Sequence, residues 1–253
     1  MLYTCANTDP RPMGPSRPDK PLSQLRPDTL AIVPLRGGSK GLPGKNTRLL
    51  AGQPLYRYAL DAAREAGIAS VVISTDIEAV LATDHGTGVR AVRRPAELAT
   101  DTTPMNAVLL HLLAQPEMKA GTVVLLQATS PLRRGEHIEA ALDLYATGKH
   151  ELVMSVVATD AGILKYGFVE SGSFVPVNDV NYVFSNRQQL PPVYRPNGAI
   201  YVFDAQWFLQ SGGFATGKIG AYVMTTDDSH DIDNADDFAR CEQLLLARRN
   251  PVR

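Results

Sequence analysis

The 253-residue sequence has little cysteine and no long apolar run. Its two cysteines, Cys5 and Cys241, stand far apart, so they form neither a disulfide framework nor the closely spaced ligand pairs of a zinc site. No run of about 18 apolar residues occurs, and no segment has the charged, apolar and small-residue order of a secretory signal. We therefore expect a protein of the reducing cytoplasm that does not span a membrane.

Net charge is also nearly absent, at −1. A chain without an excess of basic residues has no general attraction for nucleic acid or for an anionic membrane, so any affinity for anions must be local. Apolar residues are plentiful, at 44%. They suffice for the core of one large α/β domain, with or without an appendage.

Proline is concentrated at the beginning of the chain. Residues 1–28 hold six of the 18 prolines among polar neighbours. Such a composition cannot bury enough apolar surface to offset the entropy lost on ordering. We predict a disordered tail over 1–28 and a single domain over 29–253.

Within that domain, short β-rich runs alternate with helical periodicity. The pattern predicts strands at 30–35, 70–74, 89–92, 122–127, 152–158, 199–203 and 221–224 and helices at 55–66, 77–83, 105–114, 136–146, 205–210 and about 235–247. Runs such as 71–73 and 123–126 are almost wholly apolar, as in parallel strands covered on both faces. We therefore predict an α/β fold with a doubly wound, mostly parallel sheet.

The alternation stops between residues 159 and 197. Glycine, proline, asparagine and glutamine are frequent there, and apolar residues come in short bursts. An irregular segment of this length is usually functional, and its apolar bursts require a surface to cover them. The segment is either a plain surface insertion or an oligomerisation arm that also covers a substrate.

The most informative segment is the glycine-rich loop, residues 36–46, which follows the first predicted strand. Its glycines allow turns whose backbone N–H groups converge on an anion, and Arg36, Lys40 and Lys45 add positive charge. It is not a Walker A loop, because Asn46 stands where a magnesium-binding hydroxyl is needed, and it lacks the spacing G-x-G-x-x-G. The loop is interpreted as a phosphate site, with a solvated turn as the alternative.

Ligands of an open parallel sheet gather at the carboxyl ends of its strands, so the residues after each strand are candidates. Arg93 and Arg94 suit contacts with phosphate or a base, although a solvated loop explains them nearly as well. Gln127 ends a buried strand and offers a donor and an acceptor to a polyhydroxylated substrate. Residues 74–76, Ser-Thr-Asp, are explained adequately as the N-cap of a helix.

Asp231 and Asp233, here called the acidic pair, follow the last predicted strand. On an extended segment both side chains point to the same side and Ile232 turns inward. Two carboxylates so placed repel each other unless a cation lies between them, and oxygen ligands with open positions suit Mg²⁺ held against a substrate phosphate. The alternative is that the pair complements the dipole of the following helix.

Together these segments closely resemble the acylneuraminate cytidylyltransferases, the enzymes that make CMP-sialic acid from CTP and the free sugar. The resemblance covers most of residues 31–240. Five segments carry it in the order of the family: 36–46, 94–102, 127–135, 188–201 and 231–233. It implies a nucleotide-diphospho-sugar transferase-like fold and a homodimer, with residues 159–197 forming much of the interface and projecting into the neighbour's site.

The resemblance also implies roles for individual residues. The nucleotide would be bound by Arg36, Gly37, Ser39, Lys40, Lys45, Asn46 and Arg94. The sugar acid would be faced by Gln127, Lys165 and Arg195. The acidic pair would hold Mg²⁺, and with Arg36 and Lys45 it would form the catalytic set.

The implied reaction is transfer of CMP from CTP to the anomeric hydroxyl of a nonulosonic acid, with release of pyrophosphate. Two alternatives stay open. The acceptor is another acid, namely pseudaminic acid, legionaminic acid, KDO or a phosphonate, or the protein binds nucleotide without catalysing a reaction.

Overall fold

The computed structural model describes residues 26, 28–39 and 41–249. The tail predicted for residues 1–28 lies outside this part of the chain except for Arg26 and Asp28, and Lys40 lies outside it as well. Arg26 donates its backbone N–H to the carbonyl of Gly67, and the carbonyl of Asp28 accepts from Thr122. These two residues therefore already contact the domain.

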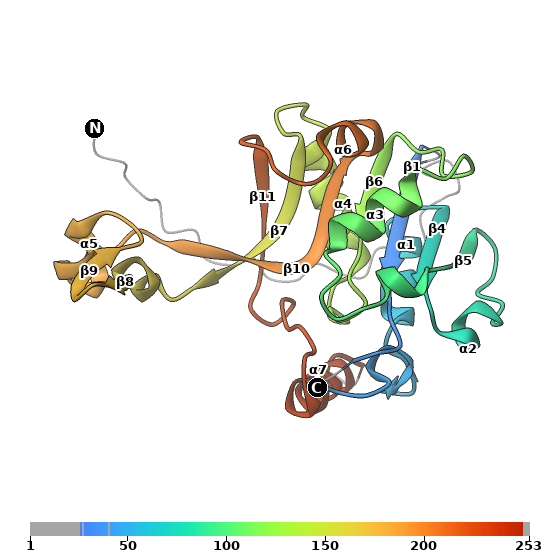
Figure 1. The fold of residues 1–253 in the computed structure, drawn as a ribbon. Coiled ribbons are helices and arrows are strands. Elements are labelled where there is room, and N and C mark those ends of the chain that lie inside the picture. The colour runs from blue at the N-terminus through green and yellow to red at the C-terminus, as the bar shows by residue number, and fades with distance from the viewer. Residues whose placement is uncertain (1–25, 27, 40, 250–253) are drawn as a thin grey trace.

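A seven-stranded sheet forms the centre of the molecule, with the strand order β11-β7-β10-β6-β1-β4-β5 (Figure 1). Its strands are β1 (Thr29–Pro34), β4 (Ser70–Thr75), β5 (Val89–Arg93), β6 (Thr122–Leu125), β7 (Leu152–Thr159), β10 (Val193–Asp204) and β11 (Ile219–Met224). Strand β10 is antiparallel to both of its neighbours, β6 and β7, and all other pairs are parallel. The predicted mostly parallel sheet is confirmed.

Strand β1 shows why this sheet is covered on both faces. Ala31 and Val33 belong to the core beneath α1 (Arg57–Glu65) and α4 (Gly135–Tyr145). Leu30 and Ile32 belong to the opposite core, with α3 (Met105–Leu113) and α6 (Ala205–Ser211). Because both faces are buried, the strand is apolar at every one of these positions.

A third core cluster joins the glycine-rich loop to the acidic pair. Helix α7 (Ala235–Arg249) lies beside the loop that follows β1, away from the two main cores (Figure 1). Leu42 of the loop, Ile232 between the two aspartates and Phe238 of α7 are buried in the same cluster. The apolar packing therefore brings together two segments that are almost 200 residues apart in the sequence.

The structure differs from the expected elements after the glycine-rich loop. The helix predicted at 55–66 is α1, which begins only at Arg57, because the preceding residues form a short hairpin of β2 (Leu49–Leu50) and β3 (Gln53–Pro54). Leu55 donates its backbone N–H to the carbonyl of Arg48, which keeps the chain extended there. The predicted helix at 77–83 is the single turn α2 (Glu78–Leu81).

Residues 159–197, here called the arm, project away from the sheet (Figure 1). The arm holds a hairpin of β8 (Gly167–Glu170) and β9 (Ser173–Pro176) and the short helix α5 (Val180–Phe184). Strands β7 and β10 enter it side by side, and their pairing extends to Thr159 and Val193.

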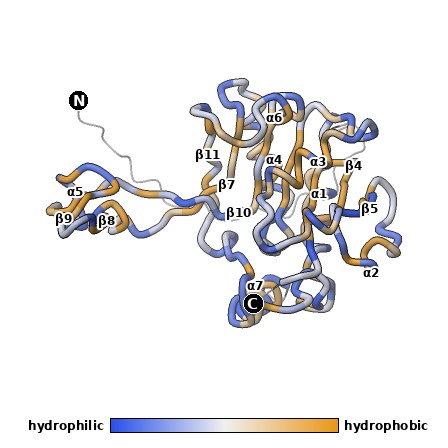
Figure 2. The backbone as a smooth tube through the Cα atoms, viewed as in Figure 1, coloured by the Kyte–Doolittle hydropathy of each residue, from blue (hydrophilic) through white to orange (hydrophobic). Residues whose placement is uncertain are grey.

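The arm contains several apolar stretches, coloured orange along the backbone in Figure 2, and many of their side chains are exposed. Val169 is 77% exposed and Phe184 is 84% exposed. The other exposed large apolar residues of the arm are Ile163, Tyr166, Phe168, Phe174, Val175, Val177, Val180 and Tyr194. Exposed apolar residues gathered in this way mark an interaction surface.

No helix in the described part of the chain is long and apolar enough to cross a membrane.

Candidate active site

A pocket opens at the carboxyl ends of the parallel strands. Three segments line it, and each follows a strand of the sheet: the glycine-rich loop after β1, Arg94 after β5 and Gln127 after β6. Its lining consists of Pro34, Leu35, Arg36, Ser39, Lys45, Asn46, Arg94, Met105, Gln127, Ala128 and Thr129. The structure therefore brings together most of the predicted nucleotide residues with one predicted substrate residue. Another hollow, at the opposite end of the sheet, contains none of them.

Two side-chain contacts hold the glycine-rich loop in place. The carboxylate of Asp76 accepts the backbone N–H of Gly37 at 2.9 Å. The amide of Asn46 donates to the carbonyl of Arg36 at 3.0 Å, so this side chain shapes the loop as well as lining the pocket. Residues 74–76 do not form the expected N-cap, because the N-cap of α2 is Ile77 and no side chain caps that helix; the hydroxyl of Thr75 accepts the N–H of Ile77 itself. Asp76 is therefore available to anchor the loop.

Arg36 forms an ion pair with Asp101 in the loop that follows β5. Sequence patterns alone did not indicate this partner. The one signal was that Asp101 belongs to 94–102, one of the segments that carry the family resemblance. The pair links the loop of β1 to the loop of β5 across the pocket, and the Arg36 side chain stays about one-third exposed.

The two neighbouring arginines, Arg93 and Arg94, have different environments. Arg93 points away from the pocket and pairs with Glu78 on the surface. Arg94 is buried, and its guanidinium donates to the carbonyl of Ser74 at 2.8 Å. Burial lowers the pKa of Arg94, and the nearby Asp76 carboxylate offsets part of this effect. Only Arg94 is therefore placed to contact a ligand in the pocket.

The glycine-rich loop contacts the acidic pair directly. The ammonium group of Lys45 donates to the carbonyl of Ile232 and lies 3.6 Å from a carboxylate oxygen of Asp233. Gly41 packs so closely on this segment that a Cβ atom would lie 2.3 Å from the carbonyl oxygen of Asp233. Any larger residue at position 41 would therefore push the two segments apart.

The two carboxylates of the acidic pair have different surroundings. Ile232 between them is fully buried, as predicted, and donates its N–H to the carbonyl of Thr129. The Asp233 side chain is 78% exposed, whereas one oxygen of Asp231, Oδ1, is buried without a hydrogen-bond partner. Burial raises the pKa of Asp231, the Thr129 hydroxyl opposes this shift, and the charge of Asp233 adds to it.

The dipole of α7 does not account for the acidic pair. Asp236 and Asp237 occupy the first turn of this helix. The carboxylate of Asp237 accepts the backbone N–H groups of Asp233 and Asn234, at 3.0 and 3.1 Å. The side-chain oxygen of Asn234 in turn accepts the free backbone N–H groups of Asp236 and Asp237 in that turn. Since Asn234 and Asp237 cap the start of the helix, Asp231 and Asp233 are left for another role.

The acidic pair fits a magnesium site by its chemistry. It offers hard carboxylate oxygens, and one of them is a buried acceptor without a donor. In the described part of the chain no group of three or more His, Cys, Asp or Glu side chains gathers around one point. Mg²⁺ would therefore complete its octahedral shell with water and substrate oxygens, which is its usual mode of binding in nucleotide sites.

A buried arginine that the sequence did not single out supports Gln127. The guanidinium of Arg133 donates to the carbonyls of Gln127 and Ala199, both at 3.0 Å. Burial lowers its pKa to about 9. On the other side, Gly198 has a left-handed backbone with φ of 78°, and a Cβ there would lie 3.5 Å from the Gln127 side chain.

Two predicted substrate residues do not reach the pocket of their own chain. Lys165 lies in the arm, where its ammonium group donates to the carbonyl of Ser185. Arg195 is exposed on the part of β10 that pairs with the end of β7, opposite Val157. Both residues lie outside the pocket lining.

Comparison with known proteins shows the family of this chain. A sequence profile described as Cytidylyltransferase matches residues 30–208. The N-acylneuraminate cytidylyltransferase of Streptococcus agalactiae serotype III (strain NEM316) is 34% identical over 220 residues, which are 83% of this chain and 51% of that protein. The chain thus spans about half the length of that curated relative.

A shorter relative is matched over nearly its whole length. The CMP-N,N'-diacetyllegionaminic acid synthase of Legionella pneumophila subsp. pneumophila (strain Philadelphia 1 / ATCC 33152 / DSM 7513) is 34% identical over 231 residues, which are 85% of this chain and 95% of that protein. Among solved structures, CMP:2-keto-3-deoxy-manno-octonic acid synthetase complexed with CTP has the same fold, with a TM-score of 0.66 at 17% identity over 87% of this chain and 99% of the other. On these matches, the chain belongs to the cytidylyltransferase family.

Proposed function

We propose that the protein transfers CMP from CTP to the anomeric hydroxyl of a nonulosonic acid and releases pyrophosphate. The names of the relatives from Streptococcus and Legionella support this activity. The observation that carries it is the contact of Lys45 with Asp233. Lys45 lines the pocket, and through this contact its cationic loop of the phosphate-binding type meets a pair of carboxylates that are not themselves part of the pocket lining.

The reaction is an in-line displacement at the α-phosphorus, so the protein must place the reactants and neutralise charge. Arg36 and Lys45 stabilise the charge that grows on the departing pyrophosphate. Arg94 and Asn46 contact the cytidine, and Gln127 hydrogen bonds to hydroxyl groups of the acceptor. Asp231 and Asp233 would hold Mg²⁺, which would supply Lewis-acid stabilisation of phosphate oxygens and a lower pKa of the attacking hydroxyl. Histidine is absent from the described pocket lining, so solvent or a carboxylate of the site accepts the proton.

Pyrophosphate release provides the test of this function. The protein is incubated with CTP and Mg²⁺ and with one acid at a time: N-acetylneuraminic, legionaminic, pseudaminic, KDO or a phosphonate. We expect release with at least one nonulosonic acid and none without an acceptor or with UTP in place of CTP. CTP binding without release under every condition would identify a silent nucleotide-binding protein instead.

We further propose that two copies associate through the arm, which supplies Lys165 and Arg195 to the neighbouring pocket. The exposed apolar side chains of the arm and the distance of both cations from their own pocket lining support this arrangement. A homodimer would cover the apolar surface and provide cations for the carboxylate of the acceptor.

Replacing Phe168 and Phe184 together with serine is expected to convert a dimer into a monomer with little activity, because both rings are largely exposed in the single chain. Light scattering coupled to size exclusion measures the mass. The matched control is Leu246→Ser on α7, which removes another exposed apolar side chain, 45% exposed, outside the arm. A wild-type monomer, or a double variant that stays dimeric, would refute the arrangement.

A further inference from the structure

The segment between β11 and α7 carries the acidic pair but has no regular secondary structure. Residues 225–234 lie between the end of β11 at Met224 and the start of α7 at Ala235. Backbone ladders therefore do not fix the direction in which Asp231 and Asp233 point. Side-chain contacts therefore contribute to holding the segment, and one buried carboxylate, that of Asp228, makes four of them.

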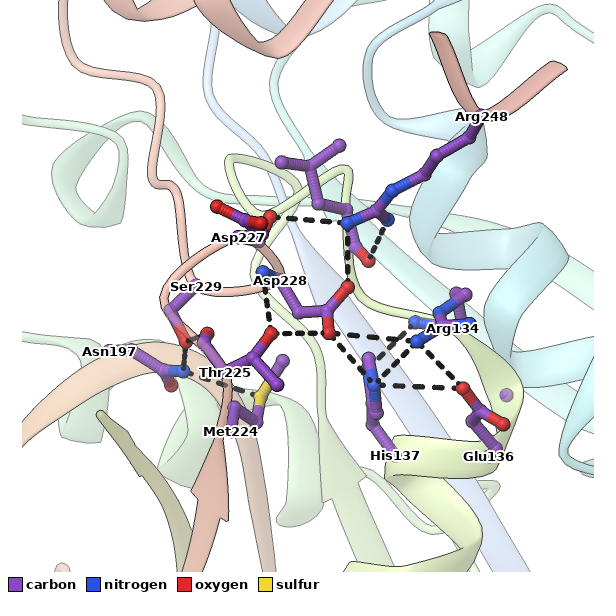
Figure 3. Close-up of polar contacts among 12 residues, drawn as sticks. Arg134, Glu136, His137, Asn197, Met224, Thr225, Asp227, Asp228, Ser229 and Arg248 are labelled. Atoms are coloured by element: carbon purple, nitrogen blue, oxygen red, sulfur yellow. Dashed lines mark hydrogen bonds and ion pairs between the residues drawn. The ribbon is translucent and has the colours of Figure 1, made fainter. Parts of the chain in front are cut away.

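Asp228 lies three residues before the acidic pair and connects several parts of the domain (Figure 3). Its Oδ2 atom accepts the hydroxyl of Thr225 at 2.6 Å and lies 3.5 Å from the guanidinium of Arg134 and 3.6 Å from Nε2 of His137. Its Oδ1 atom accepts from the guanidinium of Arg248 at 2.7 Å. One side chain thus joins the end of β11, the beginning of α4 and the last turn of α7.

The environment keeps this carboxylate charged although it is buried. Asp228 is only 5% exposed. Burial alone raises its pKa, but the Thr225 hydroxyl and the charges around it, including Arg134 and Arg248, lower the pKa below its ordinary value. A buried carboxylate held by several donors is a rigid anchor, because breaking any one contact leaves a desolvated charge with fewer partners.

The network around Asp228 also contacts the loop that follows β6. Arg248 also donates to the carbonyl of Leu132, in the loop whose Thr129 accepts the N–H of Ile232. From the sheet, the amide of Asn197 donates to the hydroxyl of Ser229 at 2.9 Å. The network around Asp228 therefore fixes the chain on the amino-terminal side of the acidic pair, while α7 fixes it on the other.

We propose that Asp228 is a positioning residue for the metal-binding acidic pair, acting through segment 225–234 and not by contact with substrate. The proposal rests on the proposed function of the pocket. Groups that orient the ligands of a metal commonly affect its affinity as strongly as a weak ligand does. Loss of the charge at Asp228 should therefore loosen metal binding more than nucleotide binding.

The test compares Asp228→Asn with Asp227→Asn. Asp227 is the neighbouring residue, and its side chain is exposed. Arg248 donates to the backbone carbonyl of Asp227, which the substitution leaves in place. For Asp228→Asn we expect the Mg²⁺ concentration at half-maximal activity to rise about tenfold, with KM for CTP within about twofold of wild type. Asp227→Asn should match wild type in both.

Two readouts do not depend on activity. Hydrogen exchange at the amides of Ile232 and Asp233, which donate to Thr129 and Asp237, should become faster in Asp228→Asn and stay unchanged in Asp227→Asn. Binding of Mn²⁺ alone, followed by electron paramagnetic resonance, should weaken in the same variant.

A second variant covers the case in which Asp228→Asn does not fold. Arg248 lies on the last turn of α7 and is partly exposed, so Arg248→Gln removes one contact of Asp228 from outside the core. It should produce the same shift in Mg²⁺ dependence to a smaller degree, and Arg248→Lys should restore part of it. Equal Mg²⁺ dependence and equal exchange in all variants of an active enzyme would overturn the proposal. A wild type that releases no pyrophosphate, but that binds Mn²⁺ more tightly than Asp228→Asn does, would overturn the proposed function and not the role of Asp228.

Discussion

Replacing Asp233 with alanine is expected to reduce the proposed CMP transfer by about a thousandfold or more, because the cation that we propose the acidic pair holds would contribute several kcal/mol to stabilising the transition state. The fold should survive the change. The side chain is 78% exposed, and the backbone N–H of Asp233 keeps its bond to Asp237. Loss of activity would therefore report on the metal site and not on the core.

Asp236→Ala is the matched control for this variant. It removes the same charge three residues later, from an exposed side chain in the first turn of α7. Pyrophosphate release over a series of Mg²⁺ concentrations, together with a thermal melt, distinguishes the two variants. If Asp233→Ala keeps substantial turnover with unaltered Mg²⁺ dependence, the acidic pair does not hold the metal.

Lys45→Met is expected to lower kcat by a factor of about 100 to 1,000, the usual cost of removing one preorganised charge from a developing anion. Lys45 is buried, and its ammonium group donates to the carbonyl of Ile232. Methionine fills nearly the same volume without the charge. We also expect the free energy of unfolding to decrease slightly, since the Ile232 carbonyl loses its donor.

Lys119→Met makes the same chemical change on an exposed side chain at the opposite end of the sheet. It should leave kcat and KM unchanged. Measuring the two constants separately is decisive, because a group that acts in the transition state lowers kcat, whereas one that binds the ground state equally well raises KM alone. A Lys45→Met enzyme with normal kcat and only a lower melting temperature would assign Lys45 a purely structural role.

The sheet and the placement of the loop were predictable because they depend on local patterns. Apolar runs such as 71–73 mark strands buried on both faces, and glycines among cations mark an anion-binding turn. No local sequence pattern indicates whether a strand runs parallel or antiparallel to its neighbours. The apolar run at 199–203 predicted a strand correctly, but its antiparallel orientation depends on the arm, which returns the chain to the sheet at the same end at which β7 leaves it.

The partners of the site residues were harder to predict, since they are distant in sequence. Asp101 pairs with Arg36 and Asp76 binds Gly37, yet each of these carboxylates looks like an ordinary loop or cap residue in the sequence. Arg133 is a buried guanidinium inside a motif that resembles a turn. Such contacts follow from the order of strands in the sheet, which periodicity does not determine.

The arm leaves the sheet as two hydrogen-bonded strands and not as a single flexible loop. The pairing of Tyr194 with Ala158 and of Arg195 with Val157 makes its base a two-stranded ribbon, and the register of the two strands shifts between Pro196 and Tyr201, where the ribbon joins the sheet. Two hydrogen-bonded strands fix the direction in which the arm projects, whereas a flexible loop would only keep its tip near the sheet. Whatever docks on the tip of the arm is therefore held at a set angle to β10, whose other end lies beside β6 in the middle of the sheet. On the proposed function, changes of acceptor preference can then arise from the base of the ribbon, through its twist, without any change in a residue that would touch the sugar.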